Sequence, residues 1–358
     1  MYGIDLFAGA GGMSLGAKAA GIEVLFSVER DRHAAETYSH NHPGVDLYPG
    51  DIRKVRKFDL SRRKRPLVVF GGPPCQGFST SNQKTRSSGN PSNWLFREFL
   101  RIVRVVAPDW VVFENVKGIF ETEGGRFYQL VSNGLSGLGY TCNHGILNAA
   151  DFGVPQHRSR LFIVGARAGG KVGLPKPNGV SRVTVREAIS DLPALPNGAS
   201  ENLRVYRTDA ASPYAKGMRG RLKISPNHFV TRNAVYVVER YRHIPKGGNW
   251  EDIPEELMGN YRDRTRCHTG IYRRLRDEEP SVTLGNYRKN MLIHPWEDRG
   301  LSVREAARLQ SFPDWFEFKG SIGFQQQQVG DAVPPLLSRA VFRAVVRAAE
   351  AANGKARK

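Results

Sequence analysis

The sequence predicts an α/β protein with a doubly wound, mostly parallel sheet and a second, smaller and irregular region. Three observations support this prediction. Short apolar runs alternate with helix-like segments through the first half of the chain, as in strands joined by helices. A glycine-rich turn follows the first apolar run, and clear periodicity ends after about residue 170. In such folds, ligands bind beyond the carboxyl ends of the strands.

The elements of the first half follow from local pattern. Residues 2–7 (YGIDLF) form a largely apolar run typical of a buried strand, and Gly21 ends the helix-like stretch after the glycine-rich turn. Residues 94–107 carry apolar side chains at helical spacing and stop at Pro108. We therefore expect strands at residues 2–7, 23–29, 45–52, 66–72, 109–116 and 160–167, and helices at 13–21 and 94–107.

The rest of the chain is less regular. Residues 169–179 (GGKVGLPKPNG) resemble a linker, and residues 180–320 are rich in Arg, Gly, Pro and Tyr without a clear period. Order returns in residues 329–352, which predict a loop opening a helix with proline at its start. Three arginines spaced four apart on that helix indicate a solvent-exposed face, namely Arg339, Arg343 and Arg347.

Composition narrows the possible functions. The 358 residues include 53 Lys and Arg against 34 Asp and Glu, a formal net charge of +19. Such an excess favours a polyanionic partner, nucleic acid first, although basic charge can also serve solubility alone. The three cysteines, Cys75, Cys142 and Cys267, show no C-x-x-C spacing, which argues against a disulfide framework or a cysteine zinc site. No apolar stretch reaches the roughly 20 residues of a membrane span, so we expect a cytoplasmic protein.

The turn DLFAGAGG after the first expected strand is a candidate ligand site. Gly9 and Gly11 let the backbone approach a ligand, and Glu29, roughly 20 residues on, can accept the hydroxyls of a ribose. Ser14 breaks the dinucleotide fingerprint, so a nucleoside without phosphates fits better. Asp51 follows the third expected strand and could meet the base. The alternative is an ordinary glycine-rich turn.

Cys75 lies in GGPPCQGFST, directly after the fourth expected strand. A thiol at the carboxyl end of a strand is a candidate nucleophile, since thiolates attack readily at neutral pH. Glu114 and Asn115 end the neighbouring expected strand, so Cys75 and Glu114 could face one pocket. A thiol and a carboxyl group suit conjugate addition to a pyrimidine, in which one attacks C6 and the other, protonated through burial, hydrogen-bonds at N3. The alternative is an ordinary cysteine in a turn.

Six segments in this order resemble the motifs of the C5-cytosine-specific DNA methyltransferases, in particular bacterial type II modification methylases: DLFAGAGG, GGPPCQGFS, FENV, FGVPQHRSRLFIVGAR, REAARLQSFP and QQQQVGDAVPP. The resemblance implies the fold of S-adenosylmethionine-dependent methyltransferases. It also implies transfer of a methyl group from S-adenosyl-L-methionine to C5 of a flipped-out cytosine in a specific double-stranded DNA sequence. S-adenosyl-L-homocysteine would be the product, and no metal is expected.

The resemblance also implies roles for single residues. Cys75 would be the nucleophile that bonds to C6 and Glu114 the partner of N3, with Arg158 and Arg160 anchoring the base and the loop. A DNA-contacting loop would include Gln76, Gly77 and Ser79. The implied cofactor pocket consists of Phe7, Gly9, Ala10, Gly11, Gly12, Glu29, Arg30, Asp51, Ile52, Pro74, Leu95, Asp331 and Ala332.

The implied organisation is a catalytic and cofactor-binding domain at 1–178, a target-recognition region at 179–322, and a segment at 323–358 that returns to the catalytic domain. The chain departs from the family at Asp331, where asparagine is usual, and aspartate keeps the acceptor but lacks the two amide donors. We expect a cytoplasmic, nucleoid-associated monomer without membrane contact, which could share its DNA site with a restriction endonuclease.

Three other functions share features with this sequence. A zinc deaminase would need a second cysteine at position 78, where this chain has Phe78. A tRNA cytosine methyltransferase of the same fold is a closer competitor, and assays on duplex DNA and tRNA would separate the two. A DNA-binding regulator without activity is the third alternative, and the presence of Cys75 and Glu114 argues against it.

Overall fold

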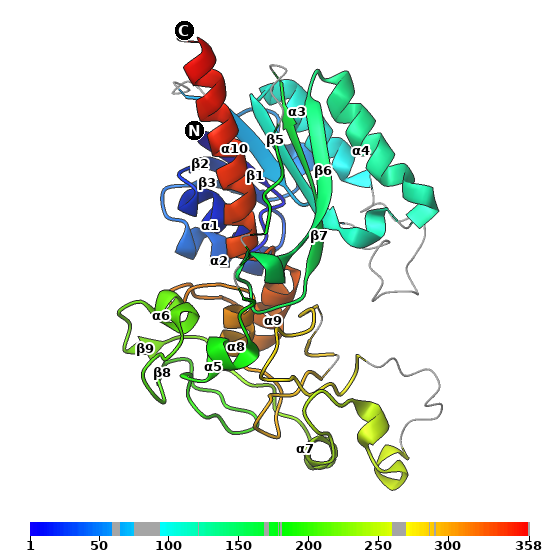
Figure 1. The fold of residues 1–358 in the computed structure, drawn as a ribbon, viewed down its shortest axis with the longest axis vertical. Coiled ribbons are helices and arrows are strands. Elements are labelled where there is room, and N and C mark those ends of the chain that lie inside the picture. The colour runs from blue at the N-terminus through cyan, green and yellow to red at the C-terminus, as the bar shows by residue number, and fades with distance from the viewer. Residues whose placement is uncertain are drawn as a thin grey trace. The chain divides into compact units, whose positions relative to one another are not determined.

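The structure is a computed structural model that describes residues 1–58, 65–74, 94–120, 122–167, 172–177, 179, 181–259, 270–285, 287–289 and 291–356. The chain forms two compact units (Figure 1). The first unit comprises Met1–Phe152, Ser159–Gly179 and Pro335–Lys358, and the second comprises Gly153–Arg158 and Val180–Pro334. The polypeptide therefore enters the second unit twice, once for a short stretch before Ser159 and once for the long middle segment.

A seven-stranded sheet forms the centre of the first unit, in the order β3-β2-β1-β4-β5-β7-β6. The five strands from β3 to β5 pair in parallel, and β7 runs antiparallel to both β5 and β6. This mostly parallel sheet with helical connections confirms the predicted fold class. The strands are β1 (Tyr2–Leu6), β2 (Glu23–Glu29), β3 (Asp46–Pro49), β4 (Leu67–Gly71), β5 (Trp110–Val116), β6 (Thr141–Asn148) and β7 (Ser159–Ala166).

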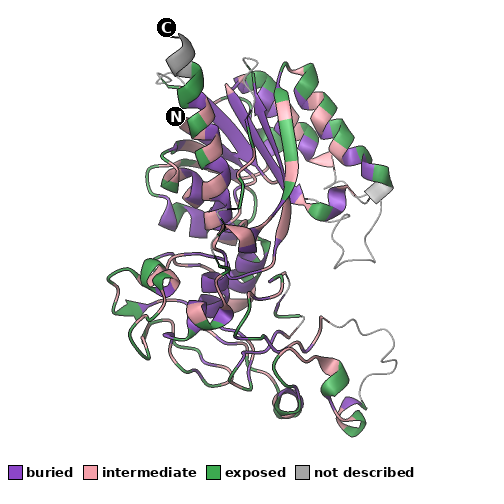
Figure 2. Cartoon of the chain, in the orientation of Figure 1, coloured by how far each residue is buried: buried purple, intermediate pink, exposed green. Residues whose placement is uncertain are grey.

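Helices cover both faces of this sheet, and its central strands are buried (Figures 1 and 2). On one face the ring of Phe70 in β4 contacts Phe342, with ring centroids 4.8 Å apart. On the other face Phe113 in β5 contacts Phe99 at 5.4 Å. Successive strand residues point to opposite faces, so the uninterrupted apolar runs fill both layers. The helices are α1 (Gly12–Ala19), α2 (Arg32–Asn41), α3 (Phe96–Val106), α4 (Arg126–Gly137) and α10 (Pro335–Ala356).

Several elements differ from the expectation. Strand β6 was missed because half of its side chains are exposed and polar residues interrupt its apolar pattern. Helices α2 and α4 were also missed, and β3 is shorter than the expected 45–52 because Asp51 caps a 3₁₀ turn at Ile52–Lys54. The loop expected at residue 329 lies instead in the last turn of α9 (Ile322–Asp331).

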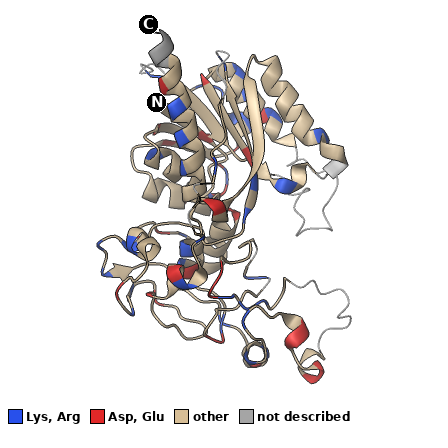
Figure 3. Cartoon of the chain, viewed as in Figure 1, with Lys and Arg blue, Asp and Glu red and all other residues tan. Residues whose placement is uncertain are grey.

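The second unit contains short elements joined by long irregular segments. Its helices are mostly one or two turns long, and its only paired strands among the described residues form a two-stranded ribbon, β8-β9. Lys and Arg are scattered among Asp and Glu along both units (Figure 3). The elements are α5 (Val185–Ile189), β8 (Arg204–Val205), α6 (Pro213–Arg219), β9 (Ile224–Ser225), α7 (Val235–Arg242), α8 (Val303–Leu309) and α9 (Ile322–Asp331).

Candidate active site

The loop between β1 and α1 turns sharply through backbone conformations that favour glycine. Phe7, Gly9 and Gly11 all have positive φ, at 62°, 56° and 96°. The Ala8 amide donates to the Val28 carbonyl at 3.0 Å, and the Gly11 amide closes the turn on the Ala8 carbonyl at 2.9 Å. The loop therefore presents main chain at the carboxyl end of β1, where a ligand can approach closely.

Glu29 at the end of β2 is bound to this loop. One carboxylate oxygen accepts the Gly9 amide at 2.7 Å, and the other accepts the Asp31 amide at 2.6 Å. Burial raises the pKa of Glu29, and these hydrogen bonds oppose the shift. A carboxylate offers about four lone-pair positions, so Glu29 keeps acceptor capacity for two further donors such as ribose hydroxyls.

Asp51 follows β3 and remains anionic. Hydrogen bonds from the Arg53 side chain, the nearest at Oδ2, lower the pKa of Asp51 to about 2. The next residue, Ile52, is buried in the core of the first unit. Asp51 therefore presents a charged acceptor whose backbone is anchored by its buried neighbour.

The ends of β4 and β5 bring Glu114 against the glycine turn of the fourth strand. The Arg160 guanidinium lies 3.1 Å from the Glu114 carboxylate, and Glu114 is 6% exposed. A Cβ on Gly72 would lie 2.5 Å from the other Glu114 oxygen, so only glycine leaves room for this carboxylate. Two of the predicted site residues, Glu114 and Arg160, are thus brought together beside Gly72, which precedes Cys75 by three residues in the sequence.

The sequence analysis predicted no role for Asn115, although its side chain binds the turn that follows β4. Its side-chain Nδ2 donates to the Pro73 carbonyl at 3.1 Å, and its Oδ1 accepts the Val116 amide at 2.9 Å. Because the oxygen is fixed by its own main chain, the NH₂ group must face Pro73. The FENV motif was the available signal, and the contact itself depends on strand pairing that the sequence does not show.

Arg158, Asp331 and Ala332 belong to the second unit. Arg158 is 1% exposed and donates to the carbonyls of Leu284 and Gly330 at 3.4 and 2.8 Å. A Cβ on Gly330 would collide with the Gly285 carbonyl, so this close packing needs glycine. Asp331 is the exposed last residue of α9, and Ala332 follows as its C-cap.

The remaining predicted residues are placed as follows. Ala10 is buried, Gly12 begins α1 and Arg30 is exposed. Pro74 and Leu95 are half-buried. Pro74 is the last described residue before residues 75–93, which lie outside the described part, and Leu95 is the second described residue after them. Cys75, Gln76, Gly77 and Ser79 lie outside the described residues.

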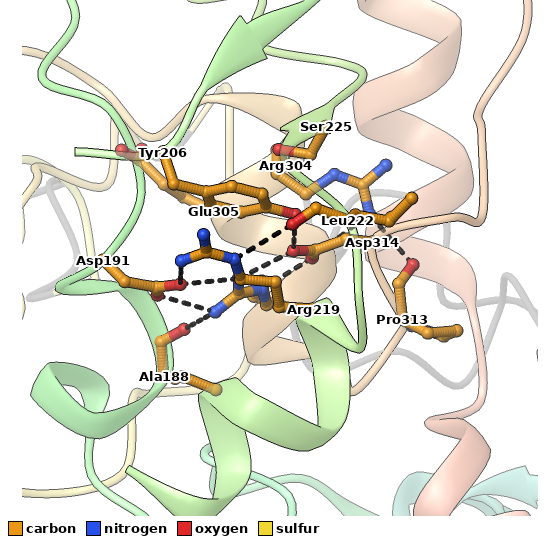
Figure 4. A network of polar contacts seen from close by, with 12 residues as sticks. Ala188, Asp191, Tyr206, Arg219, Leu222, Ser225, Arg304, Glu305, Pro313 and Asp314 are labelled. Carbon is orange, nitrogen blue, oxygen red and sulfur yellow. Dashed lines mark hydrogen bonds and ion pairs between the residues drawn. The ribbon is translucent and has the colours of Figure 1, made fainter. Parts of the chain in front are cut away.

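The REAARLQSFP motif forms a buried polar network in the second unit (Figure 4). Arg308 of α8 is fully buried and donates to Asp314 at 2.6 Å and to Asp191 at 2.9 Å. Tyr206 donates to Asp314 at 2.6 Å, and Arg304 donates to the Pro313 carbonyl at 3.1 Å. These motif residues therefore contact protein groups and build the second unit.

Within the described part of the chain, no helix is long and apolar enough to cross a membrane. In the same residues, no group of three or more His, Cys, Asp or Glu is arranged to hold a metal ion.

The model of the C-5 cytosine-specific DNA methylase family matches residues 1–347. The chain belongs to this family. Type II methyltransferase M1.HphI of Haemophilus parahaemolyticus is 38% identical over 352 residues, covering 96% of this chain and 86% of that protein. Type II methyltransferase M.DdeI of Desulfomicrobium norvegicum is 34% identical over 361 residues, covering 94% and 86%.

A solved structure shares the fold over nearly the whole chain. The E. coli prophage protein described as a candidate DNA modification methyltransferase has a TM-score of 0.80 with 26% identity, over 97% of this chain and 99% of that one. This C-5 cytosine-specific DNA methylase is therefore an enzyme of the DNA (cytosine-5-)-methyltransferase class.

Proposed function

We propose that this methylase transfers the methyl group of S-adenosyl-L-methionine to C5 of a flipped-out cytosine in a specific duplex DNA sequence, through a covalent bond between Cys75 and C6. The observation that carries the proposal is the buried Glu114 carboxylate, which Arg160 holds against the turn at Gly72. Pro74 follows this turn, and Cys75 is the next residue in the sequence.

The residues of the first unit fit the proposed cofactor. Glu29 keeps lone pairs for two hydroxyl donors, as a ribose requires, and Asp51 offers an acceptor for an amino group of the base. A Cβ built on Gly9 would meet nothing within 4 Å, so the loop has open space beside its main chain. S-adenosyl-L-methionine, when bound, supplies an electrophilic methyl group on its sulfonium and leaves as S-adenosyl-L-homocysteine.

The chain's own residues supply the activation of cytosine. The Cys75 thiolate adds to C6 and the C5–C6 double bond opens, while the Glu114 carboxyl protonates N3, so electron density collects at C5. After C5 is methylated, the C5 proton passes to a water molecule, the double bond re-forms, the thiolate leaves and N3 returns its proton to Glu114. Arg160 is placed to hold the Glu114 carboxyl in position during both proton movements.

The base must leave the duplex for this chemistry, because both faces of the ring are covered in the stack. Extrusion costs a few kcal/mol, which contacts to the flanking strand must offset. We assign Gln76, Gly77 and Ser79 to such contacts, and Arg158 to holding the last turn of α9 through the Gly330 carbonyl. Asp331 and Ala332 remain proposed cofactor contacts.

A covalent trap tests the proposal. Duplex DNA with 5-fluorocytosine at the target accepts the methyl group but cannot lose fluorine, so a denaturation-resistant adduct should form only with S-adenosyl-L-methionine. Cys75→Ala should abolish the adduct, and Glu114→Gln should slow its formation. The matched control is Cys142→Ala, because burial raises the pKa of the Cys142 thiol to about 11 and keeps it unreactive.

An adduct that persists in Cys75→Ala would contradict the assigned nucleophile. The target sequence comes from bisulfite sequencing of plasmid DNA from cells that express the protein. Parallel transfer assays on duplex DNA and tRNA, with labelled S-adenosyl-L-methionine, test the substrate, and transfer to tRNA alone would contradict the DNA assignment.

A further inference from the structure

Two aromatic rings pack against the glycine loop, that of Tyr38 in α2 and that of His42 at the C-cap of this helix. A Cβ on Gly11 would collide with the His42 imidazole and would come within 3.0 Å of the Tyr38 ring. Both residues are buried, at 1% and 0% exposed, and their ring centroids are 4.5 Å apart. The main chain of Gly11 therefore packs against the rings of Tyr38 and His42, which are tilted by 39° to each other.

The Tyr38 ring is in turn fixed by a buried chain of hydrogen bonds. Its hydroxyl lies 2.7 Å from the Ser14 hydroxyl, and Ser14 donates to the Asp5 carboxylate at 2.7 Å. Asp5 belongs to β1 and Ser14 to the first turn of α1, so the chain links the two elements that flank the loop. Tyr38 consequently has little freedom to rotate away from Gly11.

His42 is a neutral ring that packs against Gly11 and also forms a hydrogen bond with its backbone. Burial lowers the pKa of His42 to about 3, so the ring is neutral at physiological pH. It is the C-cap of α2, where the chain leaves the helix, and it follows the buried Asn41. Its position is therefore set by the helix end as well as by Tyr38.

We infer that Tyr38 and His42 are positioning residues, which fix the glycine loop by packing against Gly11 and thereby set the affinity for the nucleoside cofactor. Glu29 holds the same loop by accepting the Gly9 amide. Backbone groups bind tightly only if they are already in place, and a support of locked side chains provides this. The inference rests on the proposed cofactor pocket, and neither residue is assigned a contact with the ligand.

The test measures binding of S-adenosyl-L-homocysteine to the full-length protein by calorimetry, without DNA. His42→Ala should weaken binding about tenfold, a loss of about 1.4 kcal/mol. His42→Phe, which keeps a flat ring, should stay within about threefold of the wild type. The matched control is His40→Ala, because His40 is an exposed histidine of α2, two residues before His42.

Melting temperatures and duplex DNA affinity are measured for each variant, and calorimetry is done well below melting. Unchanged binding in a folded His42→Ala protein would overturn the inference, as would an equal loss in His42→Phe. If His42→Ala does not fold, His42→Leu replaces it, with the same expected loss. Glu29→Ala separates the two proposals: if it also leaves binding unchanged, the cofactor pocket itself is wrong.

Discussion

Different interactions stabilise the interior of each of the two units of this methylase. In the first unit, aliphatic and aromatic side chains of the sheet and its helices form a large continuous core that includes Val69, Phe99 and Ile163. In the second unit, the apolar clusters are small, such as that of Leu195, Ala199 and Val230. Among described residues, the fully buried arginines all belong to the second unit, namely Arg158, Arg299, Arg304 and Arg308.

The first unit is therefore stabilised mainly by apolar burial, which has no preferred direction, and the second by polar contacts, which need a defined geometry. Apolar burial stabilises roughly in proportion to area and tolerates similar side chains. A buried arginine is costly to desolvate and is favourable only while every partner is in place. Burial alone would raise the pKa of Asp314, but hydrogen bonds from Arg308 outweigh it and hold that pKa below its usual range. The second unit should therefore be sensitive to the loss of single partners.

The largest expected effect follows from removing Arg308. Arg308→Ala removes the hydrogen-bonded cation of Asp191 and Asp314, which should lower the free energy of unfolding by about 3–5 kcal/mol. The longer ion pairs that remain, to Arg219 at 3.8 Å and to Arg304 at 3.9 Å, replace none of the lost hydrogen bonds. Urea denaturation measures the loss, and hydrogen exchange should show it first in the second unit. A loss below about 1 kcal/mol would mean that the network does not hold this unit together.

A second effect concerns Asp5, which has a buried carboxyl in the apolar first unit. Burial raises the pKa of Asp5 to about 8, against an ordinary value of 3.8, and one of its oxygens has no hydrogen-bond partner. The folded state therefore holds a proton that the unfolded state has lost, so stability should fall as pH rises from about 4 to about 8.

Asp5→Asn removes this charge and keeps an acceptor for Ser14. The variant should be more stable than the wild type by roughly 1–3 kcal/mol at pH 9 and should lose the advantage near pH 4. Thermal melts across this pH range measure the difference. A constant difference at all pH values would contradict the assigned titration.

The third effect is a small change in the first unit's core. Ile163→Val removes one methyl group from a side chain that is 1% exposed and should cost about 1 kcal/mol. Urea denaturation gives the value, and cooperative unfolding should be retained because the neighbours remain apolar. A loss as large as that of Arg308→Ala would remove the contrast between the units.

The same contrast explains how much the sequence could predict. β4 and β5 were expected because their apolar runs are continuous, as a two-sided buried strand requires. The sequence showed α8 only as part of a family motif and did not predict a helix there. Its buried residues include Arg304 and Arg308, and a hydrophobic pattern assigns arginines to the surface. Elements that are stabilised by hydrogen bonds between side chains and backbone show no repeating pattern of apolar residues in the sequence.

The candidate site divides in the same way. Glu29 and Asp51 were predicted from their places after strands, where topology alone brings side chains to one edge of the sheet. Asn115 and His42 were given no role, because their contacts with Pro73 and Gly11 arise only when separate elements pack. Topology is readable from sequence, whereas such supporting contacts depend on the folded structure.

The smallest expected effect isolates burial from charge within the second unit. Arg242 and Glu239 form an ion pair on α7, 2.6 Å apart, with side chains 60% and 40% exposed. Solvent screens such a pair, so a double-mutant cycle with Arg242→Gln and Glu239→Gln should give a coupling of only about 0.3–0.5 kcal/mol. Arg308 makes a contact of the same length to Asp314, but both groups are buried. Coupling at Arg242 comparable to the loss in Arg308→Ala would show that charge pairing in itself stabilises this unit, and burial of the Arg308 network would then not explain its larger effect.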